Sequence, residues 1–283
     1  MRLTELLSHS LPVIASDVSA STLQRVYSPA LKSFLSATGD KELSEYNTSD
    51  PLHWKSALSV SSRTSNIYLR HLKALWRRLV NRELVHKDIF RPLPRFKTPQ
   101  HVPSALSEDQ IREFISSVSN SSLKSVFLAC VYTGCRVGEI LALSWEDIDF
   151  ARRVFTVRIT KTRTGRTLPI SRSFLDILQQ VPKAGETVFC RSDGKRYTVG
   201  YVSHSFKKYA RKAGLPDKFR LHHLRSTFAT TLLMKGVDIS KVSKLLGHSS
   251  ILITATHYSS VMAQNLHSEV DCSTSHLAAP FSA

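Results

Sequence analysis

The sequence predicts a mainly α-helical protein of two domains, with a small antiparallel β-sheet in the second domain. Apolar residues recur at helical spacing along most of the chain, and a period-two alternation replaces this spacing around residues 154–159. Residues 91–103 contain four prolines and little periodicity, which is typical of a linker. We therefore expect a helical first domain over residues 15–97 and a mixed helical and β second domain over residues 104–272.

Size and charge narrow the class of protein. A chain of 283 residues with 42% hydrophobic residues can bury two cores. Its net charge of +17 is spread over both halves, with +7 in residues 1–100 and +10 in residues 101–283. A basic surface can serve solubility alone, but an excess of this size favours a polyanionic partner over neutral metabolites.

The chain carries no signal for secretion or for a membrane. Its first residues, MRLTELLSHSLPVIAS, lack the long apolar region of a signal peptide, and no run approaches the length of a membrane span. The four cysteines form no CxxC pair, which indicates reduced thiols rather than disulfides or zinc ligands. We expect a cytoplasmic protein without a metal site.

Two helices are expected in the first domain. One begins near Ala15 and ends at Gly39, because glycine commonly stops a helix. The other runs from about Thr64 to Arg82, with apolar residues on one face. A separate stripe of this helix holds three arginines seven residues apart, Arg63, Arg70 and Arg77. The apolar face can pack while the arginines bind DNA phosphates, although a solvated surface helix gives the same pattern.

The second domain is expected to open with a helix after Ser107, which forms a capping box with Gln110. The apolar segment 123–131 predicts a buried helix. Residues 154–159 and 167–170 predict a β-hairpin whose polar turn is 161–166, and a further strand is expected at 187–190. Later helices are expected from about Ser173, around residues 202–209, and over residues 222–235 and 239–246, the last two ending at Gly236 and Gly247.

One constellation carries more chemistry than any other. Residues that can offer a proton or positive charge to a phosphate precede one late tyrosine, in the order Arg136, Lys161, His222, Arg225, His248 and Tyr258. Arginine matches the geometry of phosphate oxygens, a lysine at the hairpin turn can protonate a leaving 5′-oxygen, and Tyr258 can attack. No glycine-rich nucleotide loop or carboxylate cluster accompanies them. The pattern predicts phosphoryl transfer through a phosphotyrosine, without metal or cofactor.

The positions of these candidate residues in the sequence support some of the assignments more strongly than others. His222 and Arg225 are three residues apart, so they share a helix face, but such a pair arises by chance in a basic chain with twelve histidines. His248 follows the helix-stopping Gly247 and should project from a turn. Two further arginines of the hairpin turn, Arg163 and Arg166, do not readily release protons and are expected to clamp phosphates.

Three segments and one residue pair resemble the tyrosine recombinase (phage integrase) family. They are TGCRVGEILAL at 133–143, LHHLRSTFATTLL at 221–233, LLGHSS at 245–250, and the HY pair that ends at Tyr258. The resemblance is close in the second domain and extends to the first only in pattern. It implies a SAM-like core-binding domain and a catalytic domain that clasp double-stranded DNA. Strand cleavage would leave a 3′-phosphotyrosyl link and a free 5′-hydroxyl.

The resemblance also assigns supporting roles and an assembly. His248 would donate a hydrogen bond to the scissile phosphate, and Glu139 would orient the site rather than react. Members of the family work as homotetramers on two DNA duplexes and pass through a Holliday junction. The short first domain favours a compact, Xer-like recombinase or one from a small mobile element. A type IB topoisomerase and a DNA-binding regulator with a decayed active site are the alternatives.

Two departures from the family pattern concern the nucleophile. The interval from His248 to Tyr258 is ten residues, one more than the nine that the family leads us to expect. We expect the extra residue to bulge the segment 251–256 or to lengthen the tether that delivers Tyr258. Ser226 also stands where the family commonly has a histidine.

Overall fold

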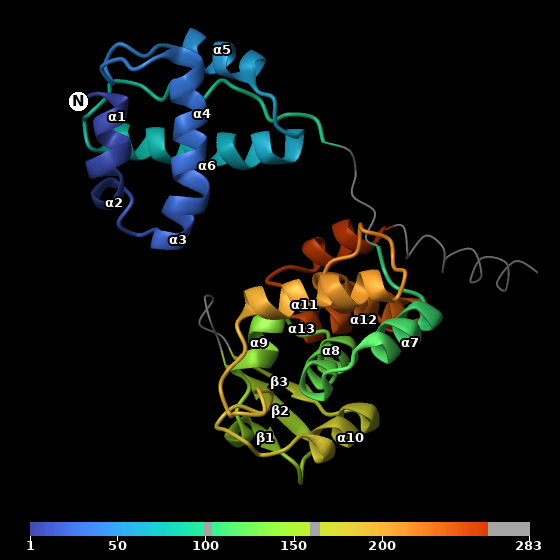
Figure 1. Ribbon diagram of the computed structural model, residues 1–283. Helices are drawn as coiled ribbons and strands as arrows, with labels where there is room; N and C mark the ends of the chain where they lie inside the picture. The colour runs from blue at the N-terminus through green and yellow to red at the C-terminus, as the bar shows by residue number, and fades with distance from the viewer. Residues whose placement is uncertain (99–103, 159–164, 260–283) are drawn as a thin grey trace, which may run out of the picture. The chain divides into compact units, whose positions relative to one another are not determined.

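The computed structural model describes residues 1–98, 104–158 and 165–259, and the chain divides into two compact units, Met1–Gln100 and His101–Ala283 (Figure 1). The described part is mainly helical and contains one antiparallel sheet of three strands, which confirms the predicted fold class. No helix in these described ranges combines the length and the apolar character needed to cross a membrane.

The regular elements in the described part of the first unit are all helices. Its elements are α1 (Leu3–Glu5), η1 (Leu6–Ser10), α2 (Leu11–Ile14), α3 (Ala20–Thr22), η2 (Leu23–Tyr27), α4 (Ser28–Thr38), α5 (Ser49–Ala57) and α6 (Ser62–Asn81). The segments η1 and η2 are single π-helical turns that join their neighbours into longer helices. Helix α4 ends at Gly39, as predicted, and this glycine has a φ of 77°.

Aromatic side chains form the centre of the first unit. Phe34 on α4 contacts the rings of Trp54, Trp76 and Phe90, with ring centroids 5.1 to 6.3 Å apart. Such tilted and edge-on pairs add to the stability gained from apolar burial. Residues 1–14 belong to the same core through Leu3, Leu6, Leu11 and Ile14, although the sequence placed the start of the domain at residue 15. Their short helices with a π-turn lack the regular spacing that reveals longer helices.

Helix α6 has the two faces that its sequence predicts. Its buried residues are Ser65, Leu69, Leu72, Leu75, Trp76 and Leu79. The arginine stripe Arg63, Arg70 and Arg77 is exposed along the helix. The Ser61 hydroxyl accepts a hydrogen bond from the Thr64 amide and caps the helix start.

The second unit packs helices around the small sheet. Its helices are α7 (Glu108–Ser117), α8 (Ser121–Thr133), α9 (Val137–Ala142), η3 (Trp145–Asp147), α10 (Arg172–Gln180), α11 (Val199–Lys212), α12 (His222–Met234) and α13 (Ile239–Leu246). The predicted capping box of Ser107 and Gln110 opens α7. Residues 251–259 are also helical. The buried helix α8 contacts both α10 and α12, so it forms the centre of this unit.

The sheet contains β1 (Ile148–Asp149), β2 (Val154–Val157) and β3 (Arg166–Pro169) in that order. The pairing of β2 with β3 confirms the predicted hairpin, with Val154 opposite Pro169 and Val157 opposite Arg166. The predicted strand at 187–190 does not form. Thr187 and Cys190 instead make isolated bridges to Ser144 and Arg196, because each end of this segment meets a different part of the chain.

Candidate active site

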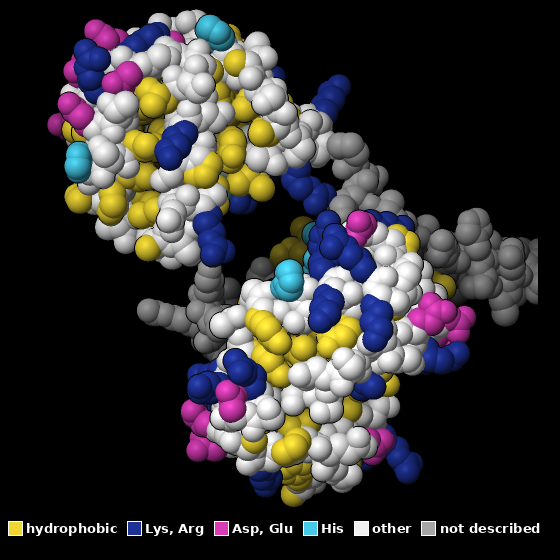
Figure 2. Space-filling view, in the orientation of Figure 1, with side chains coloured by type: hydrophobic (Ala, Val, Ile, Leu, Met, Phe, Trp, Pro, Cys, Tyr) yellow, Lys and Arg dark blue, Asp and Glu magenta, His cyan; other side chains and the backbone are white. Residues whose placement is uncertain are grey.

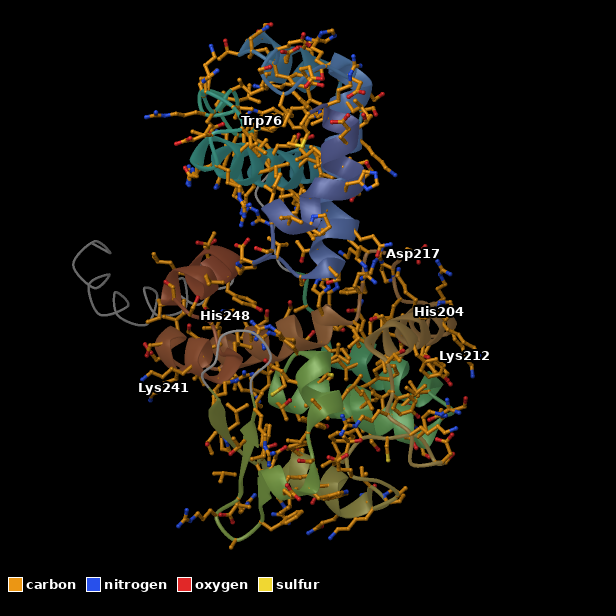
Figure 3. All side chains as sticks on the ribbon, turned by 90° about the vertical axis from the view of Figure 1, so that its left-hand side faces the viewer. Trp76, His204, Lys212, Asp217, Lys241 and His248 are labelled. Carbon is orange, nitrogen blue, oxygen red and sulfur yellow. The ribbon has the colours of Figure 1, made fainter. Side chains whose placement is uncertain are left out.

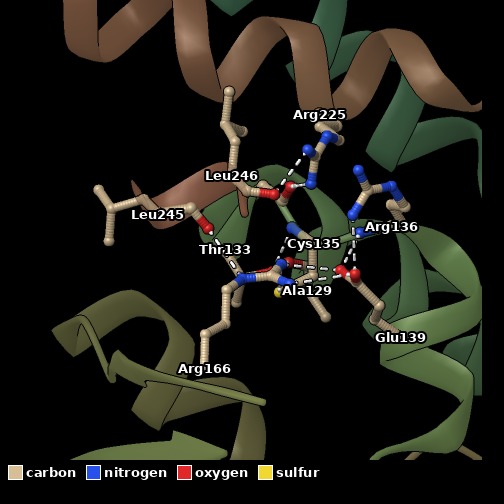
Figure 4. Close-up of polar contacts among 10 residues, drawn as sticks. Ala129, Thr133, Cys135, Arg136, Glu139, Arg166, Arg225, Leu245 and Leu246 are labelled. Carbon is tan, nitrogen blue, oxygen red and sulfur yellow. Dashed lines mark hydrogen bonds and ion pairs between the residues drawn. The ribbon is translucent and has the colours of Figure 1, made fainter. Parts of the chain in front are cut away.

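A tight turn after α8 positions Arg136. Gly134 adopts the left-handed conformation with φ 63°, and a Cβ at this position would lie 2.2 Å from the ring of Phe228 on α12. Glycine is therefore required both by backbone conformation and by space. The Thr133 hydroxyl donates to the Ala129 carbonyl at 2.6 Å and accepts from the Cys135 amide at 3.2 Å (Figure 4). The turn places Arg136 at the N-cap of α9.

Arg136 and Glu139 hold each other across the first turn of α9. The Arg136 amide donates to Glu139 Oε2 at 2.8 Å, and Arg136 Nη1 donates to Oε1 at 3.0 Å. About half of the Arg136 side chain remains exposed, with a relative accessibility of 53%. Its guanidinium can therefore bind an additional anion while Glu139 limits its movement.

Arg166 turns into the protein rather than toward solvent. Its guanidinium donates to both carboxylate oxygens of Glu139, at 3.1 and 2.8 Å, and to the Leu245 carbonyl at 3.2 Å (Figure 4). It also approaches Cys135 Sγ at 3.7 Å. The sequence suggested a phosphate clamp, but these acceptors occupy the guanidinium, and its side chain is only 19% exposed. In this geometry Arg166 joins β3 to α9 and to the end of α13.

Glu139 remains ionised in this network. Burial alone would raise the pKa of its carboxyl, but the hydrogen bonds from Arg166 and from Arg136 prevail and lower the pKa to about 2. A carboxylate with two arginine partners offsets part of the positive charge gathered in the site.

Arg225 joins two segments that lie far apart in the sequence, the turn before α9 and the end of α13. Its Nη1 donates to the Gly134 carbonyl and its Nη2 to the Leu246 carbonyl, each at 2.7 Å (Figure 4). Burial, and then the charge of Arg136, lower the pKa of Arg225 to about 10, so it is still cationic at neutral pH. The two carbonyls fix the plane of the guanidinium beside Arg136.

A pocket of about 530 Å³ opens beside these residues. Arg136, His222 and Arg225 line it together, so three of the predicted residues meet there. The pocket is also lined by basic residues that the sequence reasoning missed, His204, Lys207 and Arg220. Figure 2 shows Lys and Arg side chains gathered over α11, which supplies two of these residues. The basic residues of that amphipathic helix were the feature of the sequence that could have indicated these pocket residues.

The neighbouring His223 has a different environment. Its side chain is buried, and its Nδ1 accepts a hydrogen bond from the Arg220 amide at 2.7 Å, whereas His222 is exposed. This difference agrees with the sequence argument, in which His222, three residues before Arg225, lies on the same helix face as that arginine and His223 does not.

His248 follows α13 directly, as the sequence predicts. Gly247 has a φ of 67°, and the His248 amide donates to the Ser243 carbonyl at 3.1 Å, which fixes the backbone of the turn. His248 Nδ1 lies 2.7 Å from the hydroxyl of Thr254. Burial, and then the charge of Arg225, lower the pKa of His248 to about 4, so the imidazole is neutral at pH 7. Figure 3 shows His248 among the side chains of the carboxyl-terminal helices.

Tyr258 lies on the helical segment 251–259 and is buried against α12 and α13. Its ring packs with Ala229, Leu233, Val242 and Leu246, and only 5% of the residue is exposed. Burial raises the pKa of its phenol, while a hydrogen bond with Ser226 and the charge of Arg225 act in the opposite direction. Of the two alternatives, a bulge and a longer tether, the bulge does not occur within 251–256, where the chain is continuous helix.

The remaining predicted residues divide into two groups. Lys161 and Arg163 lie outside the described residues. The exposed arginines of α6 belong to the first unit, where two hollows of about 280 and 320 Å³ are both lined by Arg70 and Arg95. Among the described residues, no group of three His, Cys, Asp or Glu side chains could hold a metal ion.

Sequence comparisons find a family model that matches the second unit and related proteins that match most of the chain. A model described as the phage integrase family matches residues 104–265. Tyrosine recombinase XerA from Pyrococcus furiosus is 31% identical over 224 residues, which cover 76% of this chain and 76% of that protein. Tyrosine recombinase XerC from Chlamydia caviae is 26% identical, over 74% of this chain and 72% of its own length.

Two solved structures with the same fold are complexes with DNA. Lambda integrase (75–356), crystallised as a dimer bound to a COC′ core site, matches with a TM-score of 0.76 and 21% identity, covering 89% of this chain and 97% of that chain. A lambda integrase tetramer bound to a Holliday junction matches with a TM-score of 0.75 and 20% identity, covering 88% and 78% respectively. At these identities the structural likeness establishes a shared fold.

Proposed function

This chain belongs to the phage integrase family, and we propose that it cleaves DNA with Tyr258 while the cations around the Arg136 pocket bind the scissile phosphate. It is a tyrosine-type, site-specific DNA recombinase. The observation that carries the assignment of the site is the position of Arg225, which the carbonyls of Gly134 and Leu246 hold beside Arg136.

The reaction follows from the chemistry of these groups. A phosphate in the pocket receives hydrogen bonds from Arg136 and Arg225, which stabilise the negative charge that develops on its non-bridging oxygens. His222 and His248 add donors to the same phosphate. The Tyr258 oxygen attacks phosphorus, the bond to the 5′-oxygen breaks, and Lys161 supplies the proton to that oxygen. The product is a 3′-phosphotyrosine, and attack by another strand's 5′-hydroxyl reverses the step.

The nucleophile must lose its proton, here to water, as it attacks. The raised pKa of Tyr258 keeps the free phenol protonated at neutral pH, so an unbound enzyme holds an unreactive nucleophile. Approach to a phosphate beside Arg225 brings the phenol closer to positive charge and favours the phenolate. Substrate binding and activation of Tyr258 are thereby coupled.

Double-stranded DNA is the proposed partner of both units. The stripe Arg63, Arg70 and Arg77 of the proposed core-binding domain offers exposed guanidinium groups to the backbone. We further propose that a homotetramer acts on two duplexes, as the tetrameric lambda integrase bound to a Holliday junction suggests. Because the substrate is DNA, we expect the protein to work in the compartment that holds it, the cytoplasm of the cell.

A nicked suicide substrate tests the assignment of the nucleophile. Loss of the short fragment beyond the nick prevents rejoining, so the native enzyme should accumulate as a covalent complex visible in a denaturing gel, with a chelator present and without ATP. Tyr258→Phe should abolish this complex while DNA binding stays within a few-fold, because one oxygen is removed and no charge. Tyr201→Phe, at an exposed tyrosine of α11, is the matched control and should react normally. A covalent complex formed by Tyr258→Phe would refute the proposal.

A further inference from the structure

We propose that Thr254 is a positioning residue for this recombinase, because its hydroxyl joins His248 to the helix that carries Tyr258. The inference rests on the proposed roles of His248 and Tyr258. It assigns a function to the segment in which the chain has its extra residue, where the sequence alone left a bulge and a longer tether as alternatives.

The helical segment 251–259 docks through one face. Thr254 and Tyr258 are four residues apart, so they point to the same side, and they are the buried residues of the segment, at 0% and 5% exposure. Residues 251–253 and Thr256 are exposed by contrast. The hydroxyl of Thr254 meets His248, and the hydroxyl of Tyr258 meets Ser226 on α12. The Thr254 hydroxyl therefore connects the helix to His248, and the Tyr258 hydroxyl connects it to α12.

The contact with Thr254 decides how His248 can act. A neutral imidazole carries its proton on one ring nitrogen, and the hydrogen bond made by the other nitrogen selects which one. A threonine hydroxyl can donate or accept, and we infer that Thr254 donates to Nδ1. The proton then lies on Nε2, the nitrogen that can donate to a phosphate oxygen. The lowered pKa of His248 means that this choice of tautomer applies at neutral pH.

The backbone of His248 is fixed by other contacts. Gly247 adopts the left-handed conformation, and the His248 amide bonds to the Ser243 carbonyl whether or not Thr254 is present. Thr254 thus controls the side-chain torsions and the tautomer of His248 but not its place in the chain.

Single-turnover cleavage of the nicked substrate, at saturating enzyme, tests the role of Thr254. Thr254→Val keeps the branched shape and removes the hydroxyl, and it should slow cleavage by about tenfold to a hundredfold, since small misplacement of a catalytic group has effects of this size. Thr254→Ser keeps a hydroxyl and should restore cleavage to within a few-fold. Thr256→Val, on the exposed side of the same helix, is the matched control and should cleave normally.

A double-mutant cycle separates positioning from simple stability. In a His248→Ala background, Thr254→Val should cause no further loss of rate, because the residue that it positions is gone. An equal loss in both backgrounds, or no loss in the native background, would overturn the proposal. Nitrogen NMR of histidine-labelled protein gives a second readout, assigned through His248→Ala. The native signal should show the proton on Nε2, and Thr254→Val should show a mixture of tautomers; an unchanged signal contradicts the inference.

The cycle also distinguishes this proposal from the assignment of the nucleophile. If native enzyme forms the covalent complex and Tyr258→Phe does not, the proposed function stands whatever Thr254→Val does. If Tyr258→Phe still forms the complex, the proposed function fails first, while the tautomer measurement still reports on the contact between Thr254 and His248.

Discussion

The arginine stripe of α6 and the buried arginines beside α9 show two uses of the same side chain. Arg63, Arg70 and Arg77 are exposed on the first unit and make no hydrogen bond or ion pair with another described residue. Arg166 and Arg225 are largely buried in the second unit, and each donates to acceptors from distant segments. The first group can bind any phosphate that approaches, whereas the second group has its geometry fixed before a phosphate arrives.

The difference teaches that preorganisation depends on acceptors rather than on arginine itself. A guanidinium held by two backbone carbonyls needs little rearrangement when negative charge develops nearby, so it contributes to the transition state. An exposed guanidinium contributes mainly to affinity, through the counterions that its contact with DNA releases. Substitutions in the two regions should therefore change different measured quantities.

The largest expected effect is that of Arg225→Lys. Lysine keeps the positive charge but cannot donate in one plane to the Gly134 and Leu246 carbonyls and also to a phosphate. Single-turnover cleavage should fall by about a hundredfold to a thousandfold, as expected for loss of a preorganised donor. DNA affinity, measured by fluorescence anisotropy, should change by only a few-fold. A cleavage rate within tenfold of native would instead show that Arg225, like the exposed arginines, contributes mainly to DNA affinity.

Arg166→Ala should act chiefly on stability. It leaves the Glu139 carboxylate without its bidentate partner, and removing one member of a buried pair costs about 3–5 kcal/mol. Because Arg136 still pairs with Glu139, we expect the lower end of that range in urea unfolding. The salt dependence of DNA binding should be unchanged. A flatter salt dependence with native stability would instead support the phosphate clamp that the sequence suggested.

The way the free energy of unfolding changes at acid pH should report on the same network of Glu139, Arg136 and Arg166. The pKa of Glu139 is about 2 in the folded protein and lies below its ordinary value of 4.5, so the unfolded chain binds the proton more tightly. The stabilisation by its carboxylate is full above pH 4.5 and declines as the pH falls toward 2. Glu139→Gln should therefore be less stable than native protein at pH 7, and the difference between their unfolding free energies should shrink at pH 3. A constant difference would show that the charge of Glu139 is not responsible.

The smallest effect on chemistry is expected from Arg70→Ala combined with Arg77→Ala. These exposed side chains contribute little to folding, so the melting temperature should stay near native. If both contact phosphates, the slope of log affinity against log salt should become shallower by about 2. Cleavage at saturating enzyme should be unaffected. An unchanged slope would make this stripe a solvated surface.

Local patterns were sufficient for much of the fold. The two faces of α6, the capping box of α7, the β-hairpin and the glycine that ends α13 were all predicted, because each depends on residues close together in the chain. The short helices of residues 3–14 and the single bridges of Thr187 and Cys190 were missed. In those segments the structure depends on contacts with residues elsewhere in the unit, and the local spacing of apolar residues does not reveal those contacts.

The candidate site shows the same limit. Motif context led to Arg136 and Arg225, and the structure brings both to one pocket. Context could not distinguish Arg166 from a phosphate ligand, because its acceptors Glu139 and Leu245 lie 27 and 79 residues away. The contact of Thr254 with His248 spans only six residues, yet it depends on the helical phase of the segment 251–259. Because the sequence was compatible with either a bulge or a longer tether, it did not determine which residues of this segment face His248.

The two carbonyl contacts of Arg225 also set the order in which the candidate site assembles in a newly made chain. Gly134 leaves the ribosome first, Arg225 is 91 residues behind it, and Leu246 a further 21. At about 5–20 residues per second, the turn that carries Arg136 waits roughly 5–20 seconds for its partner arginine. During that interval Arg136 has Glu139 as its local partner, but Arg225 and Tyr258 have not yet been made. A chain that terminates early, before Leu246, is therefore a fragment with affinity for DNA and no means of breaking it.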